Sequence, residues 1–352
     1  MHNPMTVKSI IISRPDDWHV HFRDGDILKT VVPFTSKFFG RAVVMPNLTQ
    51  PVINNRIAKL YRKRIIDAVN SEHQFSPLMV FQLTDNIILH ELVCGFENGL
   101  LTACKLYPIN KVANPYYGVT DIKKIYNVLS VIEDLGIPLL VHGEIYEKYV
   151  DVFDYESEFI KYVMIPLRLQ FPKLKIVFEH ITTKEAARYV LDSDEFVAAT
   201  ITPQHLMFNR NKMFIGGIKP HFYCLPLLKS IVHQKALLDA IKTGCDRFFL
   251  GTDTAPHLKI YKESSCGCAG VFSSPIALAL YATVFEKFDM LKYFEAFCSF
   301  NGPKFYNLPV NKNFIMLTKK ENIVCDSIFC CNDKLIPFLA GEKLSWSASV
   351  IK

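Results

Sequence analysis

Residues 120–142, TDIKKIYNVLSVIEDLGIPLLVH, contain one complete unit of the fold that we predict for this chain. The segment Thr120–Leu135 has the i, i+3, i+4 spacing of a helix with one buried face, with apolar residues at Ile122, Ile125, Tyr126 and Leu129. Gly136 follows, at the position where helices commonly end on a left-handed glycine. The apolar run Pro138–His142 then predicts a buried strand that ends in a histidine.

The same alternation of strand and helix recurs along the chain. Further helical patterns cover Asn54–Asn70, Pro226–Thr243 and Ser274–Phe288, and Thr182–Glu185 has the spacing of a capping box. Strands that alternate with helices lie parallel and are joined by right-handed crossovers. Eight mostly continuous apolar runs predict strands buried on both faces: Trp18–His21, Ala42–Met45, Leu78–Leu83, Leu101–Leu106, Pro138–His142, Lys175–Ile181, Phe196–Ile201 and Phe248–Gly251.

A closed (β/α)8 barrel and an open doubly wound sheet both fit these elements, and the placement of polar residues distinguishes them. Barrel enzymes carry their chemistry at the carboxyl ends of several strands, whereas open sheets gather it at one switch point. Six of the eight runs end in polar or ligand-type residues, which are His19 and His21, Asn47, Lys105, His142, Glu179 and His180, and Asp253. We therefore predict an α/β fold, a (β/α)8 TIM barrel over residues 1–305, with residues 306–352 as a small C-terminal extension packed on it.

Composition limits the class of protein. Half of the 352 residues are hydrophobic, which is enough for a large core, and no apolar run reaches the roughly 18 residues of a membrane span. The N-terminus lacks the pattern of an export signal, and the net charge of +6 is too small and dispersed to indicate a nucleic-acid partner. The ten cysteines have no C-x-x-C spacing, so we expect reduced thiols, a cytoplasmic location, and Cys266 and Cys268 as small loop residues rather than metal ligands.

The pair His19 and His21 is the sharpest local signal. Residues i and i+2 project from one face of a strand, so both imidazoles can reach one metal ion, although two core histidines would have the same spacing. His142, His180 and Asp253 at three other strand ends favour the metal site, because a core would not bury so many polar groups without compensation. The remaining histidines are expected to be structural or exposed, namely His2, His73, His90, His205, His221 and His233.

Lys105 lies in the mostly apolar strand 103–108. Burial lowers the pKa of a lysine, and a neutral amine can add CO₂ to form a carbamate, whose two oxygens can bridge two cations. The alternative is an unmodified lysine that extends to the strand end or pairs with Asp253.

Arg23, Asn47 and His257 together indicate a binding site for a carboxylate. Arginine offers a planar fork to a carboxylate, and asparagine and histidine add directional hydrogen bonds. Singly, each has a plainer explanation, because Arg23 could pair with Asp24 or Asp26 at the surface and Asn47 could be a turn residue.

Six motifs together resemble the dihydroorotase family, in its single-function bacterial type, within the amidohydrolase superfamily. The resemblance covers nearly the whole chain. The motifs are RPDDWHVHFRDG (14–25), VMPN (44–47), CKLYP (104–108), VHGE (141–144), FEH (178–180) and GTDTAPH (251–257).

The resemblance implies two Zn²⁺ ions per chain, bridged by carboxylated Lys105 and a hydroxide. The other ligands would be His19, His21 and Asp253 for one ion and His142 and His180 for its neighbour. The substrate's ring carboxylate would be held by Arg23, Asn47 and His257, with backbone contacts at Leu225 and Ala269.

The same resemblance implies a reaction, the reversible cyclisation of N-carbamoyl-L-aspartate to L-dihydroorotate in pyrimidine (UMP) synthesis, with Asp253 as proton carrier, and it implies a homodimer. One departure concerns the lid loop, where the family often has two threonines and this chain has Val112 and Ala113. These two side chains lack hydroxyls for a substrate hydrogen bond, so Asn110, Lys111 or Asn114 would have to take their place or the lid would act mainly by excluding water, and no lid residue is included among the expected site residues. Two alternatives are another amidohydrolase, such as a hydantoinase or a deaminase, and an inactive scaffold; the carboxylate group of residues disfavours the first, and the complete ligand set disfavours the second.

Overall fold

The computed structural model describes residues 7–108, 118–265 and 267–351, and its centre is a sheet of eight parallel strands hydrogen-bonded in chain order. All eight predicted strands are present, each within three residues of its expected bounds. The strands are β2 (Asp17–Val20), β3 (Arg41–Val44), β4 (Ser76–Gln82), β5 (Leu101–Leu106), β6 (Leu139–Val141), β7 (Ile176–Phe178), β8 (Val197–Ile201) and β9 (Phe248–Leu250).

The last strand returns to the first, so the sheet closes into a barrel. Closure depends on a seam of individual contacts between β2 and the segment after β9. The Asp17 carboxylate accepts hydrogen bonds from the Thr252 amide at 2.9 Å and the Thr252 hydroxyl at 2.6 Å. Beyond it, the Asp253 amide donates to the His19 carbonyl at 2.9 Å, and Val20 forms a parallel bridge with Thr254. The seam confirms the closed (β/α)8 barrel and excludes the open sheet.

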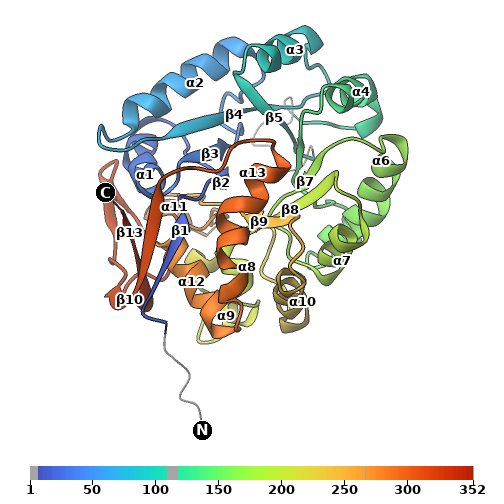
Figure 1. The fold of residues 1–352 in the computed structure, drawn as a ribbon. Helices are drawn as coiled ribbons and strands as arrows, with labels where there is room; N and C mark the ends of the chain where they lie inside the picture. The colour runs from blue at the N-terminus through green and yellow to red at the C-terminus, as the bar shows by residue number, and fades with distance from the viewer. Residues whose placement is uncertain (1–6, 109–117, 266, 352) are drawn as a thin grey trace.

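Helices between the strands surround the barrel (Figure 1). The longer ones are α1 (Gly25–Phe38), α2 (Asn55–Ala68), α3 (Leu89–Glu97), α4 (Tyr126–Asp134), α6 (Ile165–Gln170), α7 (Lys184–Asp192), α10 (Ile231–Lys242) and α12 (Ala277–Lys287). The short ones are α5 (Tyr155–Phe159), α8 (Pro203–Met207), α9 (Asn211–Phe214), α11 (Lys259–Lys262) and α13 (Asn301–Phe305). Single 3₁₀ or π turns cover Ile122–Ile125, Ile160–Met164, Pro220–Phe222, Leu291–Tyr293 and Ala296–Phe300. Within the described residues, no helix combines the length and apolar character needed to cross a membrane.

The predicted helical patterns correspond to α2, α4, α10 and α12, and Gly136 ends α4 in the left-handed region at φ +67°. The predicted capping box is wrong by one residue. The helix cap is Thr183, whose side chain accepts a hydrogen bond from the Ala186 amide. Thr182 stays outside the helix because its amide and hydroxyl donate to the buried carboxylate of Glu156, at 3.0 and 2.8 Å.

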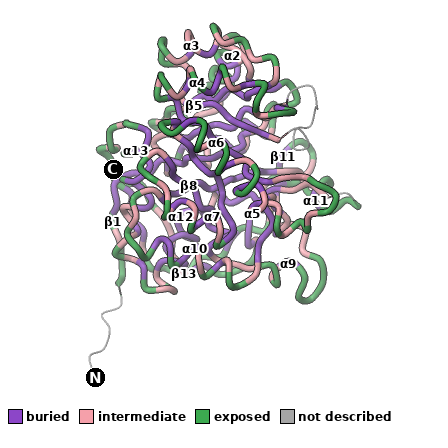
Figure 2. The backbone as a smooth tube through the Cα atoms, turned by 90° about the vertical axis from the view of Figure 1, so that its right-hand side faces the viewer, coloured by how far each residue is buried: buried purple, intermediate pink, exposed green. Residues whose placement is uncertain are grey.

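Apolar side chains fill the lower part of the barrel interior, and the buried strands lie at the centre of the molecule (Figure 2). Side chains alternate between the two faces of a strand, so every second residue points inward. One side chain from each of several strands forms this layer, including Trp18, Val80, Ala103, Leu140 and Val177. Tyr306 closes the layer from below, stacked on Trp18 with ring centroids 4.3 Å apart.

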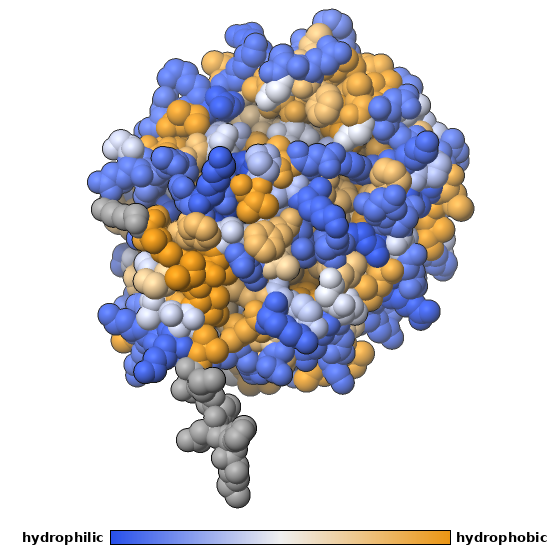
Figure 3. Space-filling model, in the orientation of Figure 1, coloured by the Kyte–Doolittle hydropathy of each residue, from blue (hydrophilic) through white to orange (hydrophobic). Residues whose placement is uncertain are grey.

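A second, antiparallel sheet joins the two ends of the chain. Its strands are β1 (Ser9–Ser13), β10 (Phe314–Ile323) and β13 (Lys343–Val350), with β10 in the middle, and a hairpin of β11 (Ile328–Cys330) and β12 (Asp333–Leu335) lies between β10 and β13 in sequence. Ile12 pairs with Ile315, and both are fully buried. Hydrophobic residues appear on the outer surface near both chain ends (Figure 3), where Ile11 and Phe314 are exposed. The N-terminal strand thus packs with the C-terminal segment, and the division at residue 305 stays a prediction.

Candidate metal centre and substrate pocket

A polar layer lies directly above the apolar layer inside the barrel. Lys105 follows Ala103 by two residues on β5, and Glu179 follows Val177 by two residues after β7. The period of two that turns Ala103 and Val177 inward therefore also turns these two polar side chains inward. Both are fully buried, so their charges and hydrogen bonds must be satisfied inside the protein.

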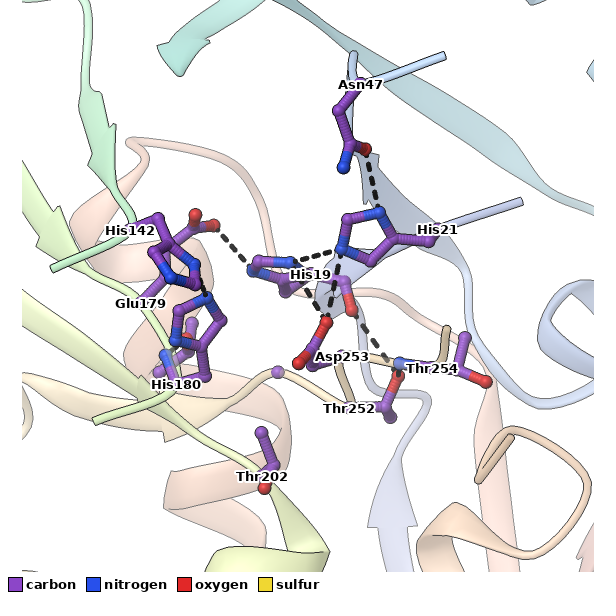
Figure 4. Close-up of polar contacts among 12 residues, drawn as sticks. His19, His21, Asn47, His142, Glu179, His180, Thr202, Thr252, Asp253 and Thr254 are labelled. Atoms are coloured by element: carbon purple, nitrogen blue, oxygen red, sulfur yellow. Dashed lines mark hydrogen bonds and ion pairs between the residues drawn. The ribbon is translucent and has the colours of Figure 1, made fainter. Parts of the chain in front are cut away.

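His19, His21 and Asp253 converge on one point at the barrel seam (Figure 4). The Nε2 atoms of the two histidines lie 3.1 Å apart. An Asp253 carboxylate oxygen lies 3.3 Å from Nε2 of His19 and 3.2 Å from Nε2 of His21. All the candidate ligand atoms of these three residues lie within 4.8 Å of one another.

The outer nitrogens of the two rings have different neighbours. Nδ1 of His19 lies 2.9 Å from a Glu179 carboxylate oxygen, and Nδ1 of His21 lies 2.9 Å from the side-chain oxygen of Asn47. The Asn47 oxygen is an acceptor, so Nδ1 of His21 carries the hydrogen and its Nε2 presents a lone pair to the shared point. Burial lowers the pKa of both imidazoles, so they are neutral near pH 7. Two imidazole nitrogens and a carboxylate oxygen that converge in this way are ligand types that a divalent cation takes.

His142 and His180 form a second group beside the first. Nδ1 of His142 lies 3.2 Å from Nε2 of His180, while Nε2 of His142 lies 2.9 Å from the carboxylate of Glu144. The His180 ring centroid is 5.0 Å from that of His19, and the ligand atoms of His19, Glu179 and His180 lie within 4.8 Å of one another. Burial holds the pKa of His180 well below its usual value. The two groups therefore lie side by side, and His19 belongs to both sets of candidate ligand atoms.

Lys105 lies between these groups, and its ammonium nitrogen contacts the carboxylate of Glu179. Asp253, named as the partner of an unmodified lysine, is not within ion-pair distance of Lys105. Burial lowers the pKa of Lys105 well below its usual value. The sequence predicts Glu179 only as a residue at a strand end. Its position two residues after the inward-facing Val177 is the signal that identifies it as a member of the polar layer.

Three site residues have a strained backbone. Arg23, His180 and Asp253 have φ values of +59°, +43° and +46°, which side-chain-bearing residues seldom adopt. Each lies in the turn that follows a strand of the barrel. Strain of this kind persists where the surrounding structure holds a residue in place for function.

A cavity of about 170 Å³ opens above the two histidine groups. It brings together all five residues that were predicted to contact substrate and several of the predicted metal ligands. Its lining comprises His21, Arg23, Asn47, Tyr107, His142, His180, Leu225, Asp253, Ala255, His257, Ala269 and Gly270. His19 and Lys105 lie buried outside this lining. Tyr107, Ala255 and Gly270 were not predicted, because their place in the cavity follows from tertiary packing rather than from a local motif.

Arg23 faces the cavity and does not form the surface salt bridge considered for it. Its guanidinium lies 2.8 Å from Nε2 of His257 and donates to the Pro256 carbonyl at 3.1 Å. Asp24 pairs instead with Arg64, and Asp26 with Lys29.

His257 also contacts the Ala269 carbonyl, 3.1 Å from Nε2. Burial and the Arg23 cation lower the pKa of His257 to about 3, so its ring is neutral near pH 7. Asn47, given as a turn residue or a substrate contact, lines the cavity and also orients His21.

Of the other histidines, His205 is buried beside the cavity. Its Nε2 lies 2.9 Å from the Pro226 carbonyl, next to Leu225, and its Nδ1 lies 2.7 Å from the Thr202 hydroxyl. Its role is thus structural, at the edge of the site. Val112, Ala113 and Cys266 lie outside the described residues.

The family model described as "Amidohydrolase family" matches residues 11–315 of this chain. The chain is 60% identical over 348 residues to a dihydroorotase of Photorhabdus laumondii, covering 98% of this chain and 99% of that one. Among solved structures, a dihydroorotase of Campylobacter jejuni has 32% identity, a TM-score of 0.86 and 98% coverage of both chains. A dihydroorotase of Saccharomyces cerevisiae in complex with 5-fluoroorotic acid has 28% identity and a TM-score of 0.89, covering 98% of this chain and 99% of that one.

The chain belongs to the amidohydrolase family, a class of enzyme with which its barrel and its polar layer agree. Within that family its function is that of a dihydroorotase, a hydrolase of cyclic amides that acts on a small molecule.

Proposed function

We propose that this dihydroorotase interconverts N-carbamoyl-L-aspartate and L-dihydroorotate at a binuclear zinc centre, as a step of pyrimidine synthesis. The observation that carries the metal centre is the convergence of the Nε2 atoms of His19 and His21 with an Asp253 carboxylate oxygen, at 3.1–3.3 Å from one another. Imidazole nitrogens and carboxylate oxygens are the ligands that zinc takes in proteins.

Lys105, carboxylated on its amine, would bridge two Zn²⁺ ions. The remaining ligands are His19, His21 and Asp253 for one ion and His142 and His180 for its neighbour. Two such ions would make water a nucleophile near neutral pH and polarise the amide carbonyl. The burial that lowers the pKa of Lys105 supports this assignment, because only the neutral amine reacts with CO₂.

Asp253 is the proposed proton carrier. In hydrolysis its carboxylate takes a proton from the attacking water and gives it to the ring nitrogen as the carbon–nitrogen bond breaks. In cyclisation the carboxylate removes a proton from the ureido nitrogen, which attacks the substrate carboxylate, and the substrate carboxylate oxygen leaves as water with that proton and one further proton from solution. The strained backbone of Asp253, held by the seam to β2, keeps its side chain at the edge of the cavity.

The substrate carboxylate is proposed to lie against Arg23, His257 and Asn47. Arg23 is the charged member of this group, and a planar guanidinium binds a carboxylate through two parallel hydrogen bonds. Backbone groups of Leu225 and Ala269 on the cavity wall would contact the ring amide. A neutral hydantoin would leave the buried Arg23 charge unpaired, so this pocket favours substrates that carry a carboxylate.

Three further features remain proposals. A homodimer is expected from the family and from the frequency of two-fold assemblies. A cytoplasmic location is in keeping with the free thiols of the nine described cysteines. Residues 306–352 are proposed as an extension of the barrel domain at 1–305.

The decisive experiment measures zinc content together with dihydroorotate hydrolysis in the native protein and in Lys105→Ala. We expect about two zinc ions per native chain, with zinc and activity both lost in the variant. Lys175→Ala is the matched control, since Lys175 is a partly buried lysine that donates to the Phe305 carbonyl at 3.2 Å at the opposite end of the barrel. Full zinc content and turnover in Lys105→Ala would refute the bridging role.

A further inference from the structure

Two loops form part of the wall of the cavity. One contains Leu225 and the other contains Ala269, the two residues proposed to contact the substrate through their backbones. A backbone contact requires that a peptide group face the ligand, and loops do not fix peptide orientation by a regular ladder of hydrogen bonds. Some other group must therefore hold these peptides in place.

Lys262 is that group. It is the last residue of α11, and only 3% of it is exposed. Its ammonium donates to the carbonyls of Tyr223, Cys268 and Gly270, at 3.0, 2.7 and 2.8 Å. Within the described part of the chain no carboxylate pairs with it, and burial lowers its pKa to about 8. The loops thus surround a buried cation with three backbone oxygens and with the Tyr223 ring, whose centroid lies 5.8 Å from the ammonium.

The geometry of the three carbonyls explains how Ala269 comes to face the cavity. The carbonyls of Cys268 and Gly270 turn toward the ammonium, whereas the Ala269 carbonyl between them lies 3.1 Å from Nε2 of His257 on the cavity wall. The Tyr223 carbonyl also accepts the Gly270 amide at 2.9 Å, which joins the two loops directly.

The backbone at Gly270 leaves little room for rearrangement. Its φ of +147° suits glycine, and a Cβ atom there would lie 2.3 Å from the Ala255 carbonyl. The loop therefore packs against the segment after β9, and the Lys262 ammonium fixes the direction of the peptide groups within it.

We propose that Lys262 is a positioning residue, which holds the two loops so that the backbone at Leu225 and Ala269 meets the substrate. This inference rests on the proposed substrate contacts. Lys262 does not line the cavity, so its loss should weaken substrate binding while the metal centre and the chemical step stay intact. A lysine suits this place because its three N–H donors match three carbonyls, whereas the planar fork of an arginine does not.

The test compares Lys262→Met, which keeps the length and loses the donors, with Lys262→Gln, which keeps two donors. For Lys262→Met we expect KM for dihydroorotate and Kd for 5-fluoroorotate to rise about tenfold or more, with kcat within about threefold and zinc content unchanged. Lys262→Gln should recover part of the loss. If Lys262 only stabilised the fold, its replacement would not raise KM and Kd while kcat stayed the same.

Two control variants keep the result specific. Lys259→Met alters the same short helix at a half-exposed lysine, and Lys175→Met removes a lysine bound to a carbonyl at the far end of the barrel. Both should bind substrate normally. Equal losses in the controls, unchanged KM and Kd in Lys262→Met, or failure of both Lys262 variants to fold would overturn the proposal. Arg23→Met tests the proposed function separately from the role of Lys262. A normal KM in Arg23→Met would show that the proposed carboxylate pocket does not bind the substrate.

Discussion

The two layers inside the barrel come from the same strands, yet they have opposite chemistry. The lower layer packs Ala103, Leu140 and Val177, and the upper layer begins two residues later on the same strands with Lys105 and Glu179. Both layers are buried, so burial alone does not distinguish structure from function. The lower layer is stabilised by the close packing of its apolar side chains. In the upper layer imidazole nitrogens and carboxylate oxygens converge, and we propose that cations bind there.

The largest effect should come from Asp253→Asn, which removes the proposed proton carrier from the upper layer while it keeps the shape of the side chain. We expect kcat for dihydroorotate hydrolysis to fall about 10³-fold. Steady-state kinetics on protein saturated with zinc measures the loss. Retention of turnover within tenfold would show that another group carries the proton.

The lower layer should respond in stability rather than in chemistry. Leu140→Ala leaves a cavity two residues below His142, and we expect it to lower the free energy of unfolding by about 3 kcal/mol. Urea denaturation gives that change, and zinc content with kcat per folded chain should remain near native. Loss of zinc in this variant would mean that the two layers are not separable.

Glu179→Gln tests how the upper layer is supported. One carboxylate oxygen lies 2.9 Å from Nδ1 of His19, and the other contacts the Lys105 ammonium. Its neutralisation should lower zinc affinity about 10- to 100-fold, because such partners orient the ligands and raise their basicity. Competition with a chelating indicator measures the affinity, with the partly exposed Glu158→Gln on α5 as the control.

A buried histidine outside both layers should give a smaller, pH-dependent effect. Burial lowers the pKa of His205 to about 4 from 6.5, so as pH falls below 6.5 the unfolded chain takes up the proton first and native stability drops. Between pH 7 and pH 5 this amounts to about 2 kcal/mol. His205→Gln should lose that share of the pH dependence, as urea titrations at both pH values would reveal. If the free energies of unfolding of the native and variant proteins changed equally between pH 7 and pH 5, His205 would not be the source of this pH dependence.

The smallest expected effect concerns Val112, which lies outside the described residues and which the family resemblance assigns to a lid loop. The resemblance leads us to expect threonine at this place, so Val112→Thr should change KM or kcat by a few-fold through one added hydrogen bond. Val112→Ile, which adds bulk without a hydroxyl, is the control for shape. Identical kinetics in all three proteins would show that residue 112 makes no substrate contact.

Local patterns predicted the strands because a strand buried on both faces needs a continuous apolar run, as in Leu101–Leu106. They also predicted the candidate site residues at the strand ends, and the cavity brings Arg23, His257 and Asp253 together. The errors and omissions share one cause. Thr182 left the helix cap because Glu156, 26 residues earlier, accepts its hydrogen bonds.

Glu179 and Lys262 were missed for the same reason, since their partners are distant in sequence. The Glu179 carboxylate lies against His19, and the Lys262 ammonium donates to main-chain carbonyls, which no side-chain motif encodes. The residue type shows which interactions a side chain can form, but only the fold shows which partners lie beside it.

The seam between Asp17 and Thr252 has a consequence for how the enzyme is made. The two residues are 235 positions apart, and the contacts between them bring Asp253 to His19 and His21. During synthesis on the ribosome, His19 and His21 are therefore added early. The candidate centre can form only after β9 and Asp253, which follows it, have been added. Premature termination products are consequently unable to assemble the centre, and catalytic competence reports that translation has passed this point.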